Sequence, residues 1–303
     1  MDDSPDGTSR YREASVKVAT VRWVDRVAWG VVEGEVLRDA GSLAPSLRAF
    51  LEAGGGPEEL AAHRGPEVPL AGVDWLPPVL DPSKIWCTGL NFEDYRRRLG
   101  LEYLKAPNIF LKAPSALVGH RARVGVPSGY GTVFHEWELT AVVGRRLREA
   151  TPEEAAASIF GYTILDDLTF HEIELVSRDH QQWAKNVDGF APCGPWVVTQ
   201  DEVDPAGGLT MRRFRNGKLE AESSTAQMRH QLPEVLAFIS TFSTLLPGDL
   251  VTGGTPPAGP CGVGDLIVGE IEGVGSLEVE LVDRPVDPSW QGVIADYEGK
   301  ERP

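Results

Sequence analysis

Short apolar segments that alternate with polar positions recur along most of the chain. Residues 16–39 show the period-two alternation of short β-strands, with a turn at Glu33-Gly34-Glu35. Further strands are expected at residues 84–90, 134–144, 161–165, 195–199, 249–252 and 265–282, and a hairpin is expected at 209–220 around Asn216-Gly217. The pattern predicts a β-rich protein of the α+β class.

A smaller number of segments carry helix signals. The run Thr-Pro-Glu-Glu at residues 151–154 has the form of a capping box with proline in the first turn, which predicts a helix to about residue 159. Residues 232–242 place apolar side chains on one helical stripe: Val235, Phe238, Ile239 and Phe242. Helices are also expected at residues 46–53, from residue 57, and at 91–104 with Asn91 as a candidate cap.

Prolines suggest where the chain divides. Pro77-Pro78 and Asp81-Pro82 interrupt the alternating pattern, and we place a domain boundary there. We expect a disordered segment at residues 1–15, a small N-terminal α/β domain at 16–80, a larger domain at 81–284 and a C-terminal tail at 285–303.

The overall charge limits the class of partner. The 303 residues include 29 Lys and Arg against 45 Asp and Glu, a net charge of −16, which argues against binding nucleic acid or an anionic membrane through bulk charge. No signal peptide and no membrane-spanning apolar run is recognised. The three cysteines, Cys87, Cys193 and Cys261, are far apart, so we expect reduced thiols in a cytoplasmic protein.

Two glutamates near the start of one predicted strand suggest chemistry. Side chains on a strand alternate between faces, so Glu136 and Glu138 point the same way, while His135 and Trp137 point the other way. Two like charges roughly 7 Å apart on a buried face repel each other, and a cation between them would remove that cost. The alternative is a pair of solvated carboxylates. We expect His135 to be structural.

A third carboxylate, Asp167, follows the buried apolar strand at residues 161–165. Taken alone, it could be a turn residue. Together with Glu136 and Glu138 it offers three oxygen ligands without His or Cys, a set that suits Mg²⁺, Mn²⁺ or Ca²⁺ rather than zinc.

Two other segments are candidates for binding a small molecule. Lys185 would bind an oxyanion if it lay beside this site, although a lone lysine is more often solvated. The glycine-rich loop at residues 253–259 lacks the Gly-Lys-Ser/Thr of a nucleotide-binding loop, and its use would be close backbone approach to a ligand.

These segments, taken in order, resemble the fumarylacetoacetate hydrolase superfamily from about residue 84 to residue 282. The resemblance is carried by Gly89-Leu90-Asn91, Phe110-Leu111-Lys112-Ala113-Pro114, Glu136-Trp137-Glu138, Leu165-Asp166-Asp167, Trp183-Ala184-Lys185 and Gly254-Thr255-Pro256. It implies a mixed β-roll fold with a metal-binding catalytic site. It also implies that the protein forms a homodimer.

The resemblance also implies roles for individual residues. It assigns Glu136, Glu138 and Asp167 as ligands of Mg²⁺ or Mn²⁺, Lys185 to the substrate or its enolate, and the loop at Gly254 and Thr255 to substrate contact. Relatives of this kind act on small 2-oxo and β-diketo acids, where the metal stabilises an enolate.

Two departures from the family pattern alter the expected chemistry. Tyr95 and Arg98 stand where a water-activating His and Glu are common, which leaves Tyr95 as a candidate substrate contact. His171 and Glu174 stand where an Arg and a Gln often clamp a substrate carboxylate. His171 is a candidate substitute base, or else a histidine paired with a neighbouring carboxylate such as Glu172 or Glu174.

Three hypotheses of function follow. The first is a metal-dependent enzyme that hydrolyses a C–C bond of a small oxo acid. The second is a hydratase, dehydratase, decarboxylase or tautomerase, because the usual water-activating pair is missing. The third is a protein that binds metal and ligand without turnover.

Overall fold

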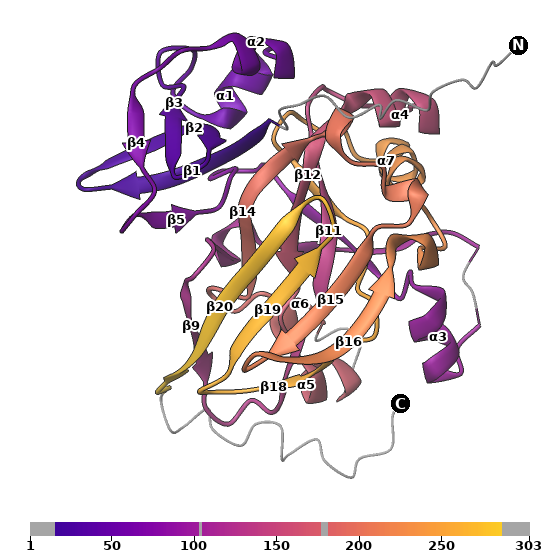
Figure 1. Ribbon diagram of the computed structural model, residues 1–303. Helices are drawn as coiled ribbons and strands as arrows, with labels where there is room; N and C mark the ends of the chain where they lie inside the picture. The colour runs from indigo at the N-terminus through magenta and orange to yellow at the C-terminus, as the bar shows by residue number, and fades with distance from the viewer. Residues whose placement is uncertain (1–15, 103–104, 177–180, 287–303) are drawn as a thin grey trace, which may run out of the picture.

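A computed structural model describes residues 16–102, 105–176 and 181–286 (Figure 1). The disorder predicted for residues 1–15, and nearly all of the tail predicted at 285–303, lie outside the described residues. The described chain is rich in strands and also contains short helices, which confirms the predicted α+β class.

The largest sheet has twelve strands and runs through the whole molecule. Ten follow one path, in the order β4 (Glu67–Pro69), β3 (Val36–Asp39), β2 (Arg26–Glu33), β1 (Lys17–Trp23), β14 (Ala191–Thr199), β12 (Ile159–Asp166), β11 (Trp137–Val143), β17 (Leu250–Thr252), β6 (Ile85–Gly89) and β7 (Asn108–Lys112). Two lie beside this path: β5 (Asp74–Leu76) pairs with β1, and β8 (Leu117–Val118) pairs with β14. Every residue of β11 and β12 is buried, so these strands form the centre of the molecule.

A five-stranded sheet covers one face of these central strands (Figure 1). Its order is β16 (Lys218–Ser224), β15 (Thr210–Arg215), β19 (Leu266–Ile271), β20 (Gly275–Arg284) and β9 (Arg123–Pro127). The sheets approach closely at Gly269, where an added Cβ would lie 2.6 Å from the Cβ of Trp137. A third sheet joins β13 (Thr169–Phe170), β10 (Val133–His135) and β18 (Gly259–Cys261).

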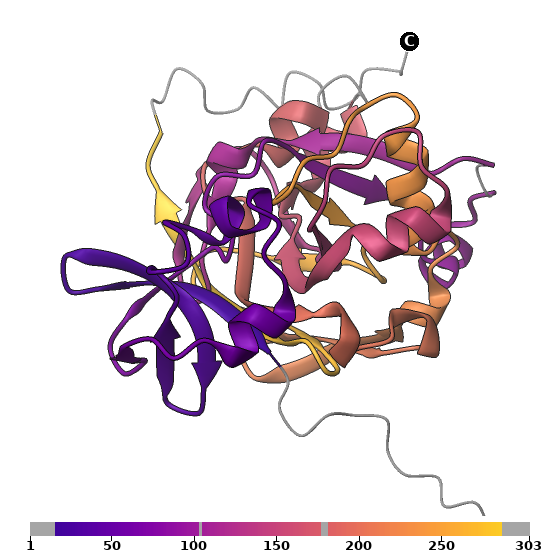
Figure 2. The same ribbon diagram turned by 90° about the horizontal axis from the view of Figure 1, so that it is seen from above.

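The helices are short and lie outside the sheets (Figures 1 and 2). They are α1 (Leu47–Glu52), α2 (Pro57–Ala62), α3 (Glu93–Leu99), α4 (Pro152–Ser158), α5 (His171–Val176), α6 (Gln181–Lys185) and α7 (Leu232–Ser240), with 3₁₀ turns at Pro114–Ala116, Gln200–Glu202, Pro205–Gly207 and Thr225–Gln227. The capping box predicted at Thr151 and Glu154 is present, and α4 packs against α7.

Three details of the predicted helices were wrong. The helix expected at residues 91–104 is α3, which begins later and ends at Gly100 with φ 66°. Asn91 is not its cap, because the Asn91 side chain donates to the carbonyl oxygens of His230 and Gly253 at 2.8 Å each. Phe242 lies beyond the end of α7 and is 55% exposed, so it does not continue the buried stripe.

The N-terminal strands extend the same large sheet. Strand β1 pairs antiparallel with β14, with Val18 opposite Val197. Val18 belongs to the same apolar cluster as Ile85 and Val142. The domain boundary near residues 77–82 stays a prediction. The large sheet and its apolar core contain residues from both sides of it.

Two smaller observations bear on the sequence analysis. The three cysteines are buried and free, as expected. Among the described residues, no helix has the length and apolar character needed to cross a membrane.

Candidate metal centre

Three carboxylates converge at the ends of the two central strands. Glu136 lies between β10 and β11, Glu138 is the second residue of β11, and Asp167 directly follows β12. One carboxylate oxygen from each lies within 4.8 Å of the others, and all three side chains are buried. The backbone N–H of Asp167 donates to the carbonyl oxygen of Glu136 at 2.9 Å, which fixes the two chain segments relative to each other.

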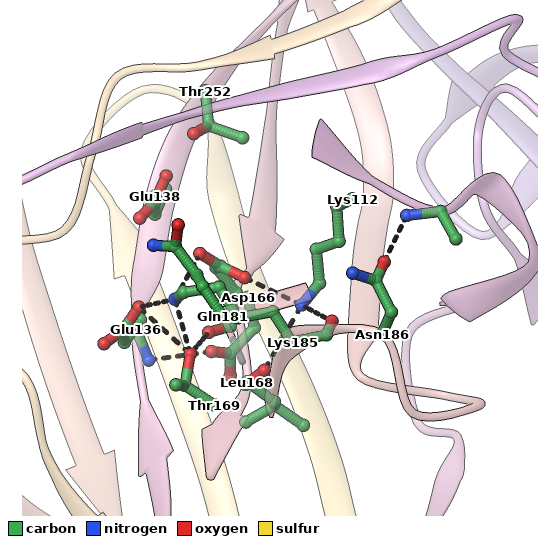
Figure 3. A network of polar contacts seen from close by, with 12 residues as sticks. Lys112, Glu136, Glu138, Asp166, Leu168, Thr169, Gln181, Lys185, Asn186 and Thr252 are labelled. Carbon is green, nitrogen blue, oxygen red and sulfur yellow. Dashed lines mark hydrogen bonds and ion pairs between the residues drawn. The ribbon is translucent and has the colours of Figure 1, made fainter. Parts of the chain in front are cut away.

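Lys185, at the end of α6, projects into this carboxylate cluster (Figure 3). Its Nζ atom lies 2.9 Å from Oε2 of Glu136, 2.8 Å from Oδ2 of Asp167 and 2.6 Å from Oγ1 of Thr169. The lysine predicted to lie beside the carboxylates is therefore in direct contact with two of them, and it is buried rather than solvated.

A second buried lysine, Lys112, was not assigned a role from the sequence. Its Nζ atom lies 2.7 Å from Oδ1 of Asp167, on the opposite carboxylate oxygen from Lys185. It also donates to the carbonyl oxygens of Leu168 and Lys185. Lys112 therefore holds both the aspartate and the backbone that carries Lys185. The sequence offered one signal of its burial: Lys112 lies two residues after Phe110 in a strand, so the two side chains share a face.

The electrostatics of the cluster follow from burial and pairing. Burial raises the pKa of Glu136 to about 7, although Lys185 opposes the shift. Burial and the neighbouring Asp167 raise the pKa of Glu138 well above its usual value. Burial alone would also raise the pKa of Asp167, but the charges of Lys112 and Lys185 outweigh it and lower that pKa. Asp167 is therefore the carboxylate best held in its ionised form.

A hard divalent cation fits this set of groups. In the described part of the chain, Glu138 forms no ion pair, and its Oε2 accepts the backbone N–H of Gly254 at 3.2 Å. Oδ1 of Asp167 is buried and is ion-paired with Lys112. Three buried carboxylates, with no sulfur or imidazole in the set, suit Mg²⁺, Mn²⁺ or Ca²⁺.

The glycine-rich loop reaches the cluster through Gly254. This residue has φ +88°, and an added Cβ would lie 2.9 Å from both the Cβ of Asn91 and the carbonyl oxygen of Thr88. Glycine is therefore needed for the backbone to come close enough to bind Glu138. The neighbouring Thr255 is buried, and its hydroxyl donates to the carbonyl oxygen of Pro256 at 2.8 Å.

Tyr95 and His171 occupy different surroundings. Burial, followed by the charges of Glu136 and Glu174, raises the pKa of Tyr95 to about 12, so the phenol stays protonated near the cluster. His171 stacks on the ring of Phe134, with ring centroids 3.9 Å apart. Glu172, one of its suggested partners, instead accepts the backbone N–H of Thr132 at 2.6 Å.

A supporting pair lies behind the carboxylates. Oδ1 of Asp166 accepts the backbone N–H of Glu136 at 2.9 Å, and Oδ2 lies 3.1 Å from Nε2 of His135. Burial and then the charge of Arg213 lower the pKa of His135 to about 3, so the imidazole is neutral. This arrangement supports the structural role expected for His135.

Comparison with known proteins gives, for most of the chain, the family that the sequence resembles. Residues 84–282 match the family described as the fumarylacetoacetate (FAA) hydrolase C-terminal domain. The chain is 35% identical over 194 residues to the mitochondrial oxaloacetate tautomerase FAHD2B of Bos taurus, a match that covers 63% of this chain and 62% of that protein.

Two solved structures share the fold. The 2-hydroxyhepta-2,4-diene-1,7-dioate isomerase of Mycobacterium marinum has a TM-score of 0.75 and 33% identity, covering 89% of this chain and 99% of that one. The maleylpyruvate hydrolase of Sphingobium sp. SYK-6, in complex with manganese(II) and pyruvate, has a TM-score of 0.74 and 28% identity, covering 88% and 99%. The three similar proteins are named for three different reactions.

Proposed function

The chain belongs to the fumarylacetoacetate hydrolase family, and on that premise we propose that it is a divalent-metal-dependent enzyme acting on a small 2-oxo or β-diketo acid through its enolate. The observation that carries this proposal is the buried cluster of Glu136, Glu138 and Asp167 with the Nζ atom of Lys185 among its oxygens. When bound, Mg²⁺ or Mn²⁺ would supply positive charge that stabilises a developing enolate.

The residues of the chain have distinct roles in this proposal. The three carboxylates hold the cation. Lys185 keeps a proton at Nζ, because the carboxylates of Asp167 and Glu136 outweigh the effect of burial and raise its pKa. An ammonium group there binds substrate oxygen and holds a proton next to the reacting atoms. Gly254 donates its backbone N–H to Glu138, and the loop that it forms with the buried Thr255 would contact the substrate on that side.

We propose tautomerisation or isomerisation as the outcome. Hydrolysis of a C–C bond requires a group that removes a proton from water, and at the position where a histidine is common this chain has Tyr95. The phenol of Tyr95, with its pKa near 12, is protonated at neutral pH and cannot act as that base. Moving a proton between carbon and oxygen of an enolate needs no activated water.

Hydrolysis of a C–C bond, the simplest hypothesis from the sequence, is the second candidate. It is favoured by the similarity to the maleylpyruvate hydrolase over nearly the whole of both chains. In that reaction another group near the cluster would have to activate water. His171 remains a candidate for this role, but no contact between His171 and the carboxylates is seen in the described residues.

Product analysis separates the two reactions. Protein loaded with Mg²⁺ or Mn²⁺ would be incubated with acylpyruvates and with the enol form of oxaloacetate. Loss of enol absorbance with unchanged product mass supports tautomerisation, whereas two smaller fragments that together gain one water support hydrolysis. Turnover that persists after complete metal chelation would contradict both. The homodimer that the resemblance implies is also part of this proposal, and light scattering after size exclusion tests it.

A further inference from the structure

We propose that Glu174 makes this site select monocarboxylic substrates, whose far end is neutral or cationic, over dicarboxylic ones. The inference rests on the proposed function, since it concerns the substrate of the same carboxylate cluster. It assigns a specificity role to one residue.

Glu174 is held over the face of α6 that carries Lys185. Gln181 and Lys185 are four residues apart on α6, so their side chains share a face of that helix. Figure 3 shows Gln181 beside Lys185 at the cluster. Nε2 of Gln181 donates to Oε1 of Glu174 at 3.2 Å, which ties the half-buried carboxylate of Glu174 to this face.

The partner of Glu174 in this contact is a neutral amide. In contrast, Asp167 and Glu136 contact the ammonium group of Lys185, and Asp167 also contacts Lys112. The charge of Glu174 is therefore not neutralised through Gln181. The charge of Glu174 also reaches Tyr95, whose pKa it raises as a smaller cause than burial and Glu136.

The charges of the site explain the expected selection. When a bound cation holds Glu136, Glu138 and Asp167 in their ionised form, these residues and Glu174 bring four negative charges, and Lys112 and Lys185 bring two positive ones. One divalent cation balances the remainder. A 2-oxo acid then adds the single negative charge of its own carboxylate, whereas a second carboxylate at its far end would approach Glu174 with no further cation among the described residues to pair with it.

The phenol of Tyr95 does not reverse this effect. Tyr95 on α3 feels the negative charges of Glu136 and Glu174 more strongly than the positive charge of Arg98, whose side chain is exposed. As a protonated phenol, Tyr95 offers a hydrogen bond to a hydroxyl, carbonyl or amide, but no positive charge to a carboxylate.

The test compares two compounds that differ in one group. Succinylpyruvate carries a distal carboxylate, and its distal carboxamide has nearly the same shape without the charge. With the Mn²⁺-loaded protein, we expect kcat/KM to be at least about tenfold higher for the carboxamide, as for a like charge at close range. In the variant Glu174→Gln, the ratio of the two kcat/KM values should fall by a similar factor. Glu93→Gln, which removes a half-buried charge from α3, should leave the ratio unchanged.

Calorimetry on the same Mn²⁺-loaded proteins measures the preference without turnover. Preferential binding of the carboxamide, lost in Glu174→Gln, supports the inference even if neither compound is converted, in which case the proposed function alone fails. The inference is overturned if the wild type prefers succinylpyruvate, if Glu174→Gln leaves the ratio unchanged, or if neither compound binds.

Discussion

Lys112 and Asp167 form an ion pair with 2.7 Å between Nζ and Oδ1, and side-chain exposures of 0% and 1%. Removing one member of such a pair leaves an uncompensated charge without water, which typically costs about 3–5 kcal/mol. The pair therefore contributes to the fold as well as to the geometry of the carboxylate cluster.

Lys112→Met should lower the free energy of unfolding by about 3 kcal/mol and kcat/KM by at least about a hundredfold, because Asp167 loses one of its two lysine partners and the carbonyl oxygen of Lys185 loses a donor. Urea unfolding and steady-state kinetics measure the two effects. Lys84→Met is the matched control, because Lys84 pairs with the fully buried Asp249 at 2.6 Å. It should destabilise the protein but spare activity per folded molecule; equal activity losses would contradict the prediction.

Asp167→Asn should weaken Mn²⁺ binding by at least about a hundredfold, since it removes the carboxylate that two lysines keep ionised. Calorimetry checks this without any substrate. In the wild type, Mn²⁺ at about one hundred times its Kd should add about 2.7 kcal/mol to the free energy of unfolding, and chelation should reverse the gain. The exposed Glu153→Gln is the control. Unchanged affinity in Asp167→Asn would show that the cluster is not the metal site.

Asp166→Ala should weaken Mn²⁺ binding by about tenfold, because the backbone of Glu136 loses its hydrogen bond to Oδ1 of Asp166. Asp166→Asn should be close to wild type. Burial raises the pKa of Asp166 well above its usual value, and an amide resembles the protonated acid in shape. His135 can adapt its tautomer, since its Nδ1 has no hydrogen-bond partner in the described chain. Equal losses in both variants would contradict a role in positioning.

His120 should make the protein less stable as the pH is lowered from about 6.5 to 4. Burial and then the charge of Arg121 lower the pKa of His120 to about 4, and its Nδ1 accepts the backbone N–H of Glu278 at 3.1 Å. Between these pH values the unfolded chain binds the proton and the folded chain does not, so stability is present above the unfolded pKa and is lost towards the folded one.

The size of this effect is about 3 kcal/mol, from a difference of two to three pKa units. In His120→Asn an amide oxygen accepts the same N–H and does not titrate, so the variant should lack this part of the loss. Urea unfolding at pH 7, 5.5 and 4.5 measures the difference between the two proteins. Parallel pH profiles would rule out His120 as a source of the dependence.

The carboxylate cluster was predictable because strand alternation is a local rule. Glu136 and Glu138 share a face by the period of two, and this holds although Glu136 falls between β10 and β11. Asp167 was recognisable as a polar residue after an apolar strand. The register of β11 and β12, with Trp137 opposite Asp166, is what brings Asp167 to Glu136, and no local pattern specifies it.

Lys112 shows what local reasoning misses. A lysine that ends a strand before Ala113-Pro114 has the pattern of a solvated residue. Its burial depends on segments distant in sequence, including the carbonyl oxygens of Leu168 and Lys185. Asn91 was misassigned for the same reason: its partners, His230 and Gly253, lie more than a hundred residues away, so a local capping role seemed the natural choice.

The pairing of β1 with β14 has a consequence for shortened forms of the protein. Removal of residues 16–80 would expose the backbone of β14 around Val197 and Val198, together with apolar side chains that Val16 and Val18 now cover. Bare strand edges recruit other chains, so such a fragment is expected to aggregate even with its carboxylate cluster intact. The N-terminal strands therefore protect the edge of β14 from pairing with other chains.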